Sequence, residues 1–428
     1  MTDAILDVKD KPKAGQWISL SLQHMFAMFG ATILVPQLVG LSPAIALLTS
    51  GIATIIFIII TQFKVPAYLG SSFAFIGPIT IATETGGIGS AMIGAMFVSL
   101  VYAIVALVIW KTGYHWLMQL LPPIVVGPVI IVIGLALSGT AVDMAMNITV
   151  NEVSQYSFKH FSAALVTLIT AIICNIYFKN IISLMPILIG IIVGYIYSAI
   201  IGIIDYTAIT EANWFAVPDF LIPGADYSFT VTPTLLFVMV PIAIVTISEH
   251  IGHQLVLGKI VKRNYIKDPG LHRSILGDGI GTFISSLVGG PPKTTYGENI
   301  GVLAITRVYS VYVILGAAVF AIIFSFLGKV MAVIDTIPTA VLGGISILLF
   351  GIIASSGLRM LVDNGIDFGD KRNLVISSVI LVIGIGGAKI EFSEAFSVEG
   401  MALAAIIGVL LNLILPGRNK EEIDDGTE

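Results

Sequence analysis

Apolar segments follow one another along this chain with only short polar turns between them. Their lengths predict fourteen membrane-spanning segments. These segments cover residues 17–37, 43–63, 70–83, 87–110, 118–138, 160–177, 180–203, 233–257, 271–290, 294–306, 308–328, 331–354, 372–388 and 399–416. Strands of a membrane barrel would be about ten residues long and would alternate in polarity, whereas these segments are longer and continuously apolar. The pattern therefore predicts an all-α polytopic membrane protein.

The composition supports this fold class. Of the 428 residues, 57% are hydrophobic and 11% are charged, and the mean hydropathy is +1.00. About a quarter of the residues are charged in an ordinary soluble domain, so a soluble protein, a nucleic-acid binder and a disordered scaffold are excluded. A single cysteine, Cys174, excludes a disulfide framework and a thiolate metal cluster. We therefore expect a lipid bilayer as the surroundings, and no metal, no cofactor and no nucleic-acid partner.

Positive charge is distributed unequally between the two sides of the membrane. An even number of segments places both termini on one side, and with that side inside, 17 of the 21 Lys and Arg residues are cytoplasmic. The outer loop 204–232 carries four acidic residues and no Lys or Arg. This bias follows the positive-inside rule and predicts a multi-pass protein of the cell membrane with cytoplasmic tails at 1–16 and 417–428. The first tail lacks the short apolar core of a signal peptide.

Two of the predicted segments are short and interrupted. The third contains the stretch 70–78, and the tenth contains the stretch 294–301, each with glycines in a mixed polar and apolar run. Neither can cross about 30 Å as one helix at 1.5 Å per residue. An interrupted backbone at this depth is stable only where it is buried in protein or lines a cavity. We expect each segment to form a short strand followed by a half-helix.

Marker residues of the first half recur in the second half at a nearly constant distance. They are Gln23-His24 with Glu249-His250 at an offset of 226, Phe73 with Tyr296 at 223, and Pro122-x-x-Val125-x-Gly127 with Pro338-x-x-Val341-x-Gly343 at 216. The unit is seven segments long, and because seven is odd the second copy must be inverted. Inverted repeats with broken segments at matching places are typical of secondary transporters, whose site lies between the half-helices.

Three acidic residues fall well inside predicted segments, namely Glu249, Asp278 and Glu298, and Asp335 lies near the end of another. A carboxylate at the centre of a membrane costs about 2.5–3.5 kcal/mol on insertion scales, so each one needs a reason. Glu249 and His253 are four residues apart and share a helix face. They indicate a carboxylate that faces a substrate and is steadied by an imidazole; the alternative is a structural hydrogen bond between two helices.

Glu298 lies where the extended part of the tenth segment becomes helix, next to free backbone N–H groups. We hypothesise that Glu298 is a fixed hydrogen-bond acceptor and that Glu249 gains and loses a coupling proton.

Asp278 lies among three glycines, which favours a role in helix packing or gating over substrate contact. His24 fits a packing hydrogen bond and a ligand equally well, and Lys293 is expected to extend outward toward water.

Aromatic residues flank both breaks. Phe73 and Tyr296 could hold a flat ring between them, although ordinary packing explains either residue nearly as well.

An intramembrane metalloprotease is disfavoured, because His250 and His253 are three residues apart and zinc sites of that type need His-Glu-x-x-His with a third ligand. A phosphate-binding loop for ATP is absent from the sequence. A channel remains a rival, but it would not require a pair of acids at mid-membrane.

The run from Thr294 to Arg307 resembles the signature of the nucleobase–ascorbate transporter family. That signature is an acid or Gln followed by Asn-x-Gly-x-x-x-x-Thr-Arg, and residues 298–307 match it completely. Gln23-His24, Ser71-Ser72-Phe73 and the stretch 249–253 resemble the uracil-transporting bacterial branch of the family. The resemblance extends from about residue 15 to residue 416.

This resemblance implies a secondary transporter, not an enzyme, that imports uracil with protons, or alternatively another nucleobase such as xanthine or urate. It implies a core domain of residues 17–110 and 233–328 that moves against a gate domain of residues 111–232 and 329–416, with a homodimer formed through the gate.

The resemblance also implies roles for individual residues. Glu249 would bind the N–H and carbonyl edge of the pyrimidine, supported by His253, and Glu298 would contact the other side of the ring. Backbone amides at Phe73 and Gly297 would meet the ring carbonyls, with Tyr296 beside them. His24, Asn299 and Asp278 are supporting candidates.

Overall fold

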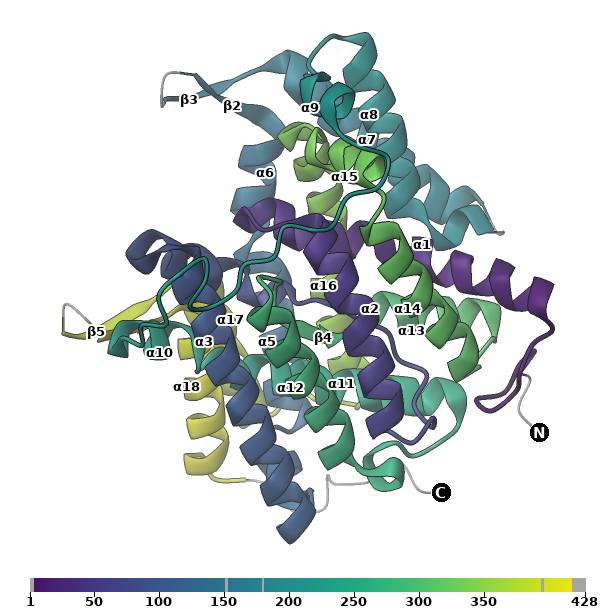
Figure 1. Ribbon diagram of the computed structural model, residues 1–428. Coiled ribbons are helices and arrows are strands. Elements are labelled where there is room, and N and C mark those ends of the chain that lie inside the picture. The colour runs from purple at the N-terminus through teal and green to yellow at the C-terminus, as the bar shows by residue number, and fades with distance from the viewer. Residues whose placement is uncertain (1–3, 151–152, 179–180, 394–395, 418–428) are drawn as a thin grey trace.

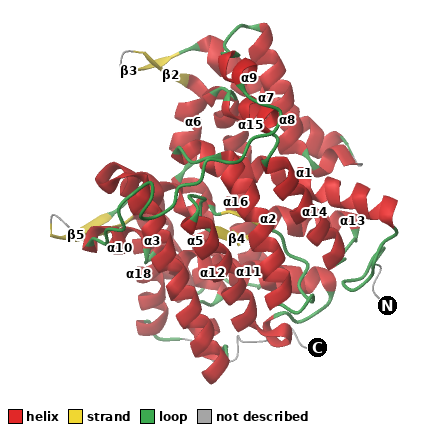
Figure 2. Ribbon diagram, in the orientation of Figure 1, coloured by secondary structure: helices red, strands yellow, loops and turns green. Residues whose placement is uncertain are grey.

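Helices make up almost all of the regular structure, and the strands are few and short (Figure 2). The computed structural model describes residues 4–150, 153–178, 181–393 and 396–417. The C-terminal tail from residue 418 onward and the first three residues of the N-terminal tail, both expected to be cytoplasmic, lie outside the described residues.

The first half of the chain contains eight α-helices and the first three strands. In order they are α1 (Ala14–Val39), α2 (Pro43–Ile60), β1 (Leu69–Ser71), the 3₁₀ turn η1 (Phe73–Phe75), α3 (Ile76–Thr112), α4 (His115–Leu120), α5 (Pro123–Ala136), α6 (Ser138–Met146), β2 (Asn147–Val150), β3 (Val153–Tyr156), α7 (Phe158–Tyr177), η2 (Ile181–Leu184) and α8 (Pro186–Ile200).

The second half begins after the short helix α9 (Thr207–Glu211). Its elements are α10 (Pro233–Met239), α11 (Ile242–Val261), η3 (Ile266–Gly270), α12 (Leu271–Leu287), β4 (Lys293–Thr295), α13 (Gly297–Thr306), α14 (Val311–Ser325), α15 (Gly328–Asp335), α16 (Thr339–Asp363), α17 (Lys371–Ile385), β5 (Lys389–Ser393), β6 (Phe396–Glu399) and α18 (Gly400–Ile414).

Several element boundaries differ from those expected from hydropathy. The third and fourth segments follow each other within α3, but the backbone at Gly87 is non-helical, with φ 77° and ψ 169°, so α3 consists of two helices divided where the sequence predicts. Segments five and twelve begin later than expected, because Pro122 and Pro338 immediately precede α5 and α16 and the apolar residues before them form the separate short helices α4 and α15. Proline cannot continue a preceding helix but suits a helix start, so it sets these two boundaries.

Among the described residues, seven helices are long and apolar enough to cross a membrane, or eight if α14 and α15, bent by 83° at their junction, count as one span. This number is lower than fourteen because α3 contains two expected segments and several others are shorter helices. The helices α8 and α18, for example, are apolar but only 15 residues long.

The helices pack in two groups. In one group α12 packs against α3 and α2, and α14 packs against α2 and α1. In the other group α16 packs against α5, α6 and α7, α7 against α8, and α17 against α5 and α18. The helices α5, α8 and α18 also touch α11 or α1, so the two groups share one large apolar core. Helices α6, α7, α8, α9 and α15 gather at one end of the molecule (Figure 1).

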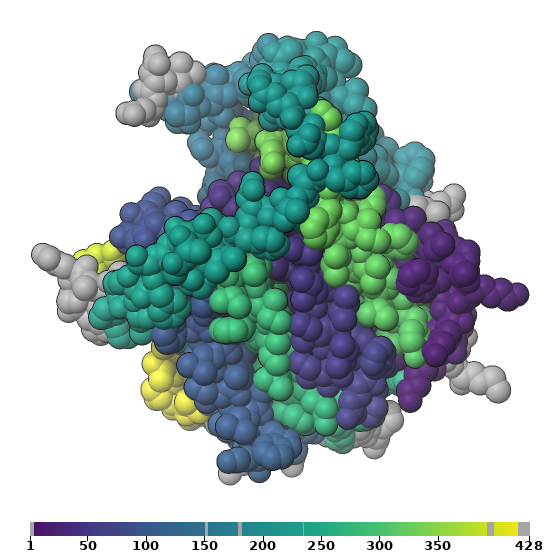
Figure 3. Space-filling view, viewed as in Figure 1, coloured from purple at the N-terminus to yellow at the C-terminus, as the bar shows by residue number. Residues whose placement is uncertain are grey.

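The expected outer loop crosses one face of the molecule as an extended segment that joins the α9 region to α10 (Figure 3). Backbone hydrogen bonds attach it to the C-terminal ends of α14 and α12, both in the first helix group. Ala216 donates to the Phe326 carbonyl at 3.1 Å, and Leu221 donates to the Val288 carbonyl at 3.2 Å. Lys329 Nζ also donates to the Ile209 carbonyl at 2.6 Å. The loop is therefore attached to the protein at three points, although most of its residues are exposed.

Candidate functional site

The two interrupted segments meet at the centre of the first helix group and pair with each other. Strand β1 runs antiparallel to β4, with Leu69 opposite Thr295, Gly70 opposite Thr294 and Ser71 opposite Lys293. All residues of both strands are buried. The pairing satisfies backbone groups that would otherwise be unbonded at this depth. Equivalent strands that run antiparallel are what an inverted repeat requires, and the prediction of two broken segments is confirmed.

A helix begins directly after each strand. Strand β1 leads through η1 into α3, and strand β4 leads into α13, whose first residue is Gly297. Helix α11 packs against η1, β4 and α13, and α1 packs against β1 and α13. Free N–H groups at the first turn of a helix can bind an acceptor. The backbone near Phe73 and Gly297 therefore offers donors beside one buried pair of strands.

Two acidic side chains lie at this junction. Glu249, on α11, is 7% exposed, and its Oε2 atom has no hydrogen-bond partner among the described residues. Glu298 lies in the first turn of α13 and is half-buried. Both Glu298 and Asp278 are close enough to Glu249 to interact with it electrostatically. Ionised carboxylates at such range repel, and a shared proton or an N–H donor between them relieves the repulsion.

Asp278 is held by a histidine of the neighbouring helix. Its Oδ2 atom lies 2.8 Å from Nδ1 of His250, and Nε2 of His250 lies 2.9 Å from the Ser274 hydroxyl. Both Asp278 and His250 are almost wholly buried. His250 is a site residue that hydropathy alone does not single out, and its place beside Glu249 and the acid on the next segment are the signals that point to it.

His253 lies between the strand and the half-helix. Its Nδ1 is 3.5 Å from the Thr295 hydroxyl, and a Cβ atom built at Gly297 would lie 3.1 Å from its Nε2. His253 was expected to support Glu249, but no hydrogen bond joins these two side chains among the described contacts. The i, i+4 spacing puts both residues on one face of α11, but His253 contacts Thr295 of β4 instead of Glu249.

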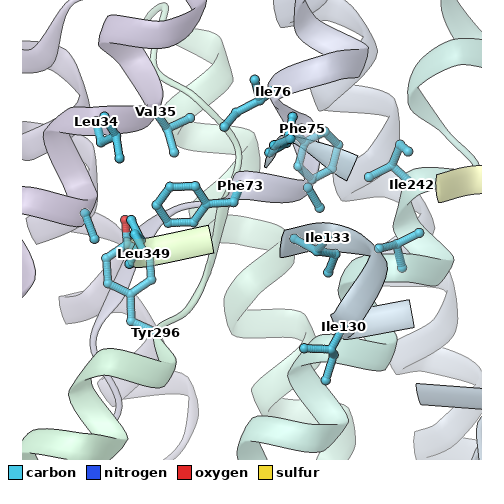
Figure 4. Close-up of a cluster of buried hydrophobic side chains, with 14 of the residues drawn as sticks. Leu34, Val35, Phe73, Phe75, Ile76, Ile130, Ile133, Ile242, Tyr296 and Leu349 are labelled. Carbon is cyan, nitrogen blue, oxygen red and sulfur yellow. The ribbon is translucent and has the colours of Figure 1, made fainter. Parts of the chain in front are cut away.

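The two aromatic residues each have packing partners. The Phe73 ring contacts Phe350 of α16 edge to face, with ring centroids 6.0 Å apart. The Tyr296 ring lies over Gly70, and its hydroxyl donates to the Ser71 carbonyl at 3.1 Å. Figure 4 shows Phe73 and Tyr296 in one buried cluster with Leu349 of α16 nearby. The idea that they hold a flat ring between them remains a prediction, and Phe350 is an aromatic neighbour that hydropathy could not single out.

Asn299 connects the half-helix to the first repeat, and His24 lies on α1, the helix of that repeat that packs against α13. His24, on α1, is 1% exposed, and neither of its ring nitrogens has a hydrogen-bond partner among the described residues. Asn299 donates from Nδ2 to the Pro66 carbonyl at 3.0 Å. The Asn299 bond holds α13 against the chain that leads into β1, and α1 packs against α13. They make both residues positioning candidates for the site.

The expectation that Lys293 extends outward is wrong. Its side chain is fully buried, and Nζ donates to the Ala46 carbonyl at 2.9 Å and to the Ser50 hydroxyl at 3.2 Å. Residues 46 and 50 lie one helical turn apart on α2 and present both acceptors to the same point. A lysine this deep can be accommodated because protein acceptors replace the water that it would otherwise reach.

The described residues contain no group of three or more His, Cys, Asp or Glu side chains that could hold a metal ion. His250, which would be needed for a zinc site with His253, uses both ring nitrogens in its bonds to Asp278 and Ser274. The arrangement offers acceptors from two acids and donors from two backbone breaks. It therefore suits a small molecule that has both donors and acceptors on its rim.

Two solved transporter structures have a similar fold. The transmembrane domain of the cyanobacterial bicarbonate transporter BicA matches with a TM-score of 0.64 and 14% identity, over 93% of this chain and 96% of that chain. The murine anion transporter Slc26a9 in its inward-facing state matches with a TM-score of 0.66 and 12% identity, over 95% of this chain and 68% of that one. The chain thus has the all-α membrane fold of two inverted seven-segment repeats.

Relatives of known name match over nearly the full length. The uracil permease of Bacillus caldolyticus is 65% identical, over 98% of this chain and 96% of its own length. The uracil permease of Bacillus subtilis (strain 168) is 60% identical over 98% and 97%, and that of Escherichia coli (strain K12) is 44% identical over 97% and 94%. The profile of the Permease family matches residues 15–392. The chain is therefore a membrane transporter, not an enzyme, and belongs to this permease family, the nucleobase–ascorbate transporters.

Proposed function

We propose that this protein imports uracil across the cell membrane together with protons, and that uracil binds where the paired strands meet α11 and α13. The observation that carries the proposal is the placement of Glu249 and Glu298 beside the two helix starts. The names of its close relatives support uracil over xanthine or urate as the substrate.

The chemistry of the site matches the rim of uracil. Uracil has two N–H donors and two carbonyl acceptors, so carboxylates at Glu249 and Glu298 can accept from the donors while backbone N–H groups at Phe73 and Gly297 serve the carbonyls. Tyr296 and Phe73 would lie beside the ring. A site that pairs every rim group rejects an analogue that lacks one, because a buried polar group is then left without a partner.

Proton coupling would rest on Glu249, His253 and Glu298. Uracil and the proton help each other bind only if the protonated site has the higher affinity for uracil. Transport would then follow from motion of a core domain (17–110 and 233–328) against a gate domain (111–232 and 329–416), which opens the site to each side in turn. We further propose that the termini are cytoplasmic and that two copies associate through their gate domains.

Uptake of labelled uracil tests the proposal. We expect cells that express the chain to accumulate uracil, to lose accumulation when a protonophore collapses the proton gradient, and to be inhibited by unlabelled uracil more strongly than by xanthine or urate. Uptake that is unaffected by the protonophore would exclude symport, and stronger competition by a purine would change the assigned substrate.

The same uptake assay distinguishes the roles of Glu249 and Glu298. If Glu249 carries the coupling proton and Glu298 is a fixed acceptor, Glu249→Gln abolishes proton-dependent accumulation. Proton-coupled uptake that survives in both Glu249→Gln and Glu298→Gln would contradict this division of roles. The exposed Glu211→Gln on α9 is the matched control, because it makes the same chemical change far from the paired strands.

A further inference from the structure

The N-terminal segment before α1 is not a free polar tail but lies along the connection between α13 and α14. The backbone N–H of Ile5 donates to the Arg307 carbonyl at 2.8 Å, that of Tyr309 donates to the Leu6 carbonyl at 2.7 Å, and that of Val311 donates to the Val8 carbonyl at 3.0 Å. Leu6 and Val308 form a parallel β-bridge. Residues 5–10, called the N-terminal clip below, thus add a short strand-like segment to the end of α13.

The clip also reaches the end of α11. Arg263, two residues beyond α11, donates from Nη2 to the Asp7 carboxylate at 2.7 Å. Val8 is completely buried in an apolar cluster that includes Leu257 and Val261 from the last turns of α11 and Leu303 from α13. The exposed ion pair contributes little by itself, and burial of Val8 is the larger attachment.

These two helices carry the two acids of the candidate site. Glu249 lies twelve residues before the end of α11, and Glu298 lies eight residues before the end of α13. At 1.5 Å per residue, the clip acts about 18 Å and about 12 Å from the two acids. A helix is stiff over such a length, so a shift at its end is transmitted to its start.

We propose that the N-terminal clip fixes α11 and α13 relative to each other and thereby sets the distance between Glu249 and Glu298. Asp7, Val8 and Arg263 are then positioning residues for the substrate site, although none of them touches it. This inference rests on the proposed function, because it takes the site between the two acids as the place where uracil binds.

Point variants of the full-length protein test the clip. Val8→Asp places a carboxylate in the apolar cluster, and Asp7→Arg and Arg263→Asp each bring like charges together. We expect Val8→Asp to weaken uracil binding to the purified protein about tenfold, since small misplacements of binding groups have effects of this order. Each single charge variant should weaken it less, by about twofold to fivefold, as the loss of a partly exposed ion pair would. The charge exchange in the double variant Asp7→Arg/Arg263→Asp should restore most of the lost affinity.

Hydrogen exchange of the α13 amides gives a second readout that needs no ligand. Exchange of residues 297–306 should be faster in Val8→Asp than in the parent protein. The matched controls are Lys9→Ala, an exposed residue of the same clip, and Val8→Ile, which keeps the buried apolar side chain. Both controls should bind uracil and exchange hydrogen as the parent does.

The outcomes separate the two proposals. If the parent does not bind uracil, the proposed function fails and hydrogen exchange alone decides the clip. If the parent binds uracil but Val8→Asp and the single charge variants bind it equally well with unchanged α13 exchange, the clip is refuted and the site stands. Loss of affinity in the single charge variants without recovery in the double variant would also refute the pairing of Asp7 with Arg263.

Discussion

Gly70 is the residue at which a single added methyl group should disturb the site most. A Cβ atom at this position would overlap the Cζ, Cε2 and hydroxyl atoms of the Tyr296 ring. The ring cannot easily move away, because it is 3% exposed and its hydroxyl is bonded to the Ser71 carbonyl. The backbone of Gly70 is fixed as well, since it pairs with Thr294 in the middle of the two strands.

Overpacking of a buried site costs about 1–3 kcal/mol. If the strain separates β1 from β4 and falls on uracil binding, Gly70→Ala should weaken the affinity by a factor of about 5 to about 150. Isothermal titration of uracil into the purified protein measures this change, and a thermal melt shows how much of the strain destabilises the fold instead.

Gly77→Ala is the control for this prediction. Gly77 lies in the half-helix after the same break, and a Cβ atom there would have no neighbour within 4 Å. It should bind uracil as the parent does. If Gly70→Ala binds uracil within about twofold of Gly77→Ala and melts at the same temperature, then the contact of Tyr296 with Gly70 does not constrain the site.

Three further predictions follow from individual contacts. Asp278→Asn should lower the free energy of unfolding by about 1.5–3 kcal/mol, because it removes the charge from a buried hydrogen bond to His250. The control Asp363→Asn, at an exposed ion pair, should have little effect. Equal melting temperatures of the two variants would contradict this prediction. Lys293→Met should lower the melting temperature, because the Ala46 carbonyl and the Ser50 hydroxyl lose a buried hydrogen-bond donor, at a cost of about 1–3 kcal/mol. A melting temperature equal to that of the parent would mean that the amine is not needed for stability. If a proton and uracil bind cooperatively, the affinity for uracil should rise as pH falls, by up to about tenfold per pH unit for one coupled proton, and an affinity independent of pH would exclude the linkage.

Much of the fold could be predicted from the sequence because the bilayer imposes simple rules. Apolar runs of defined length must become helices, so the segments and the two interruptions were visible in hydropathy. Recurring markers showed the repeat, and the cost of a charge in the membrane singled out Glu249, Asp278 and Glu298. The signature after Thr294 was long enough to indicate the family.

The sequence by itself therefore determined the fold class, the places of the two breaks and the acids beside them. Only the tertiary structure decided which groups pair. His250 rather than His253 meets a carboxylate, Lys293 turns inward to α2, and Val8 of an apparently polar tail is buried. Hydropathy averages over a segment and carries no information about which face of a helix meets which neighbour. Partner choice depends on contacts between residues of different helices, from 28 positions apart for His250 and Asp278 to 247 for Lys293 and Ala46. These contacts exist only after the helices have packed together.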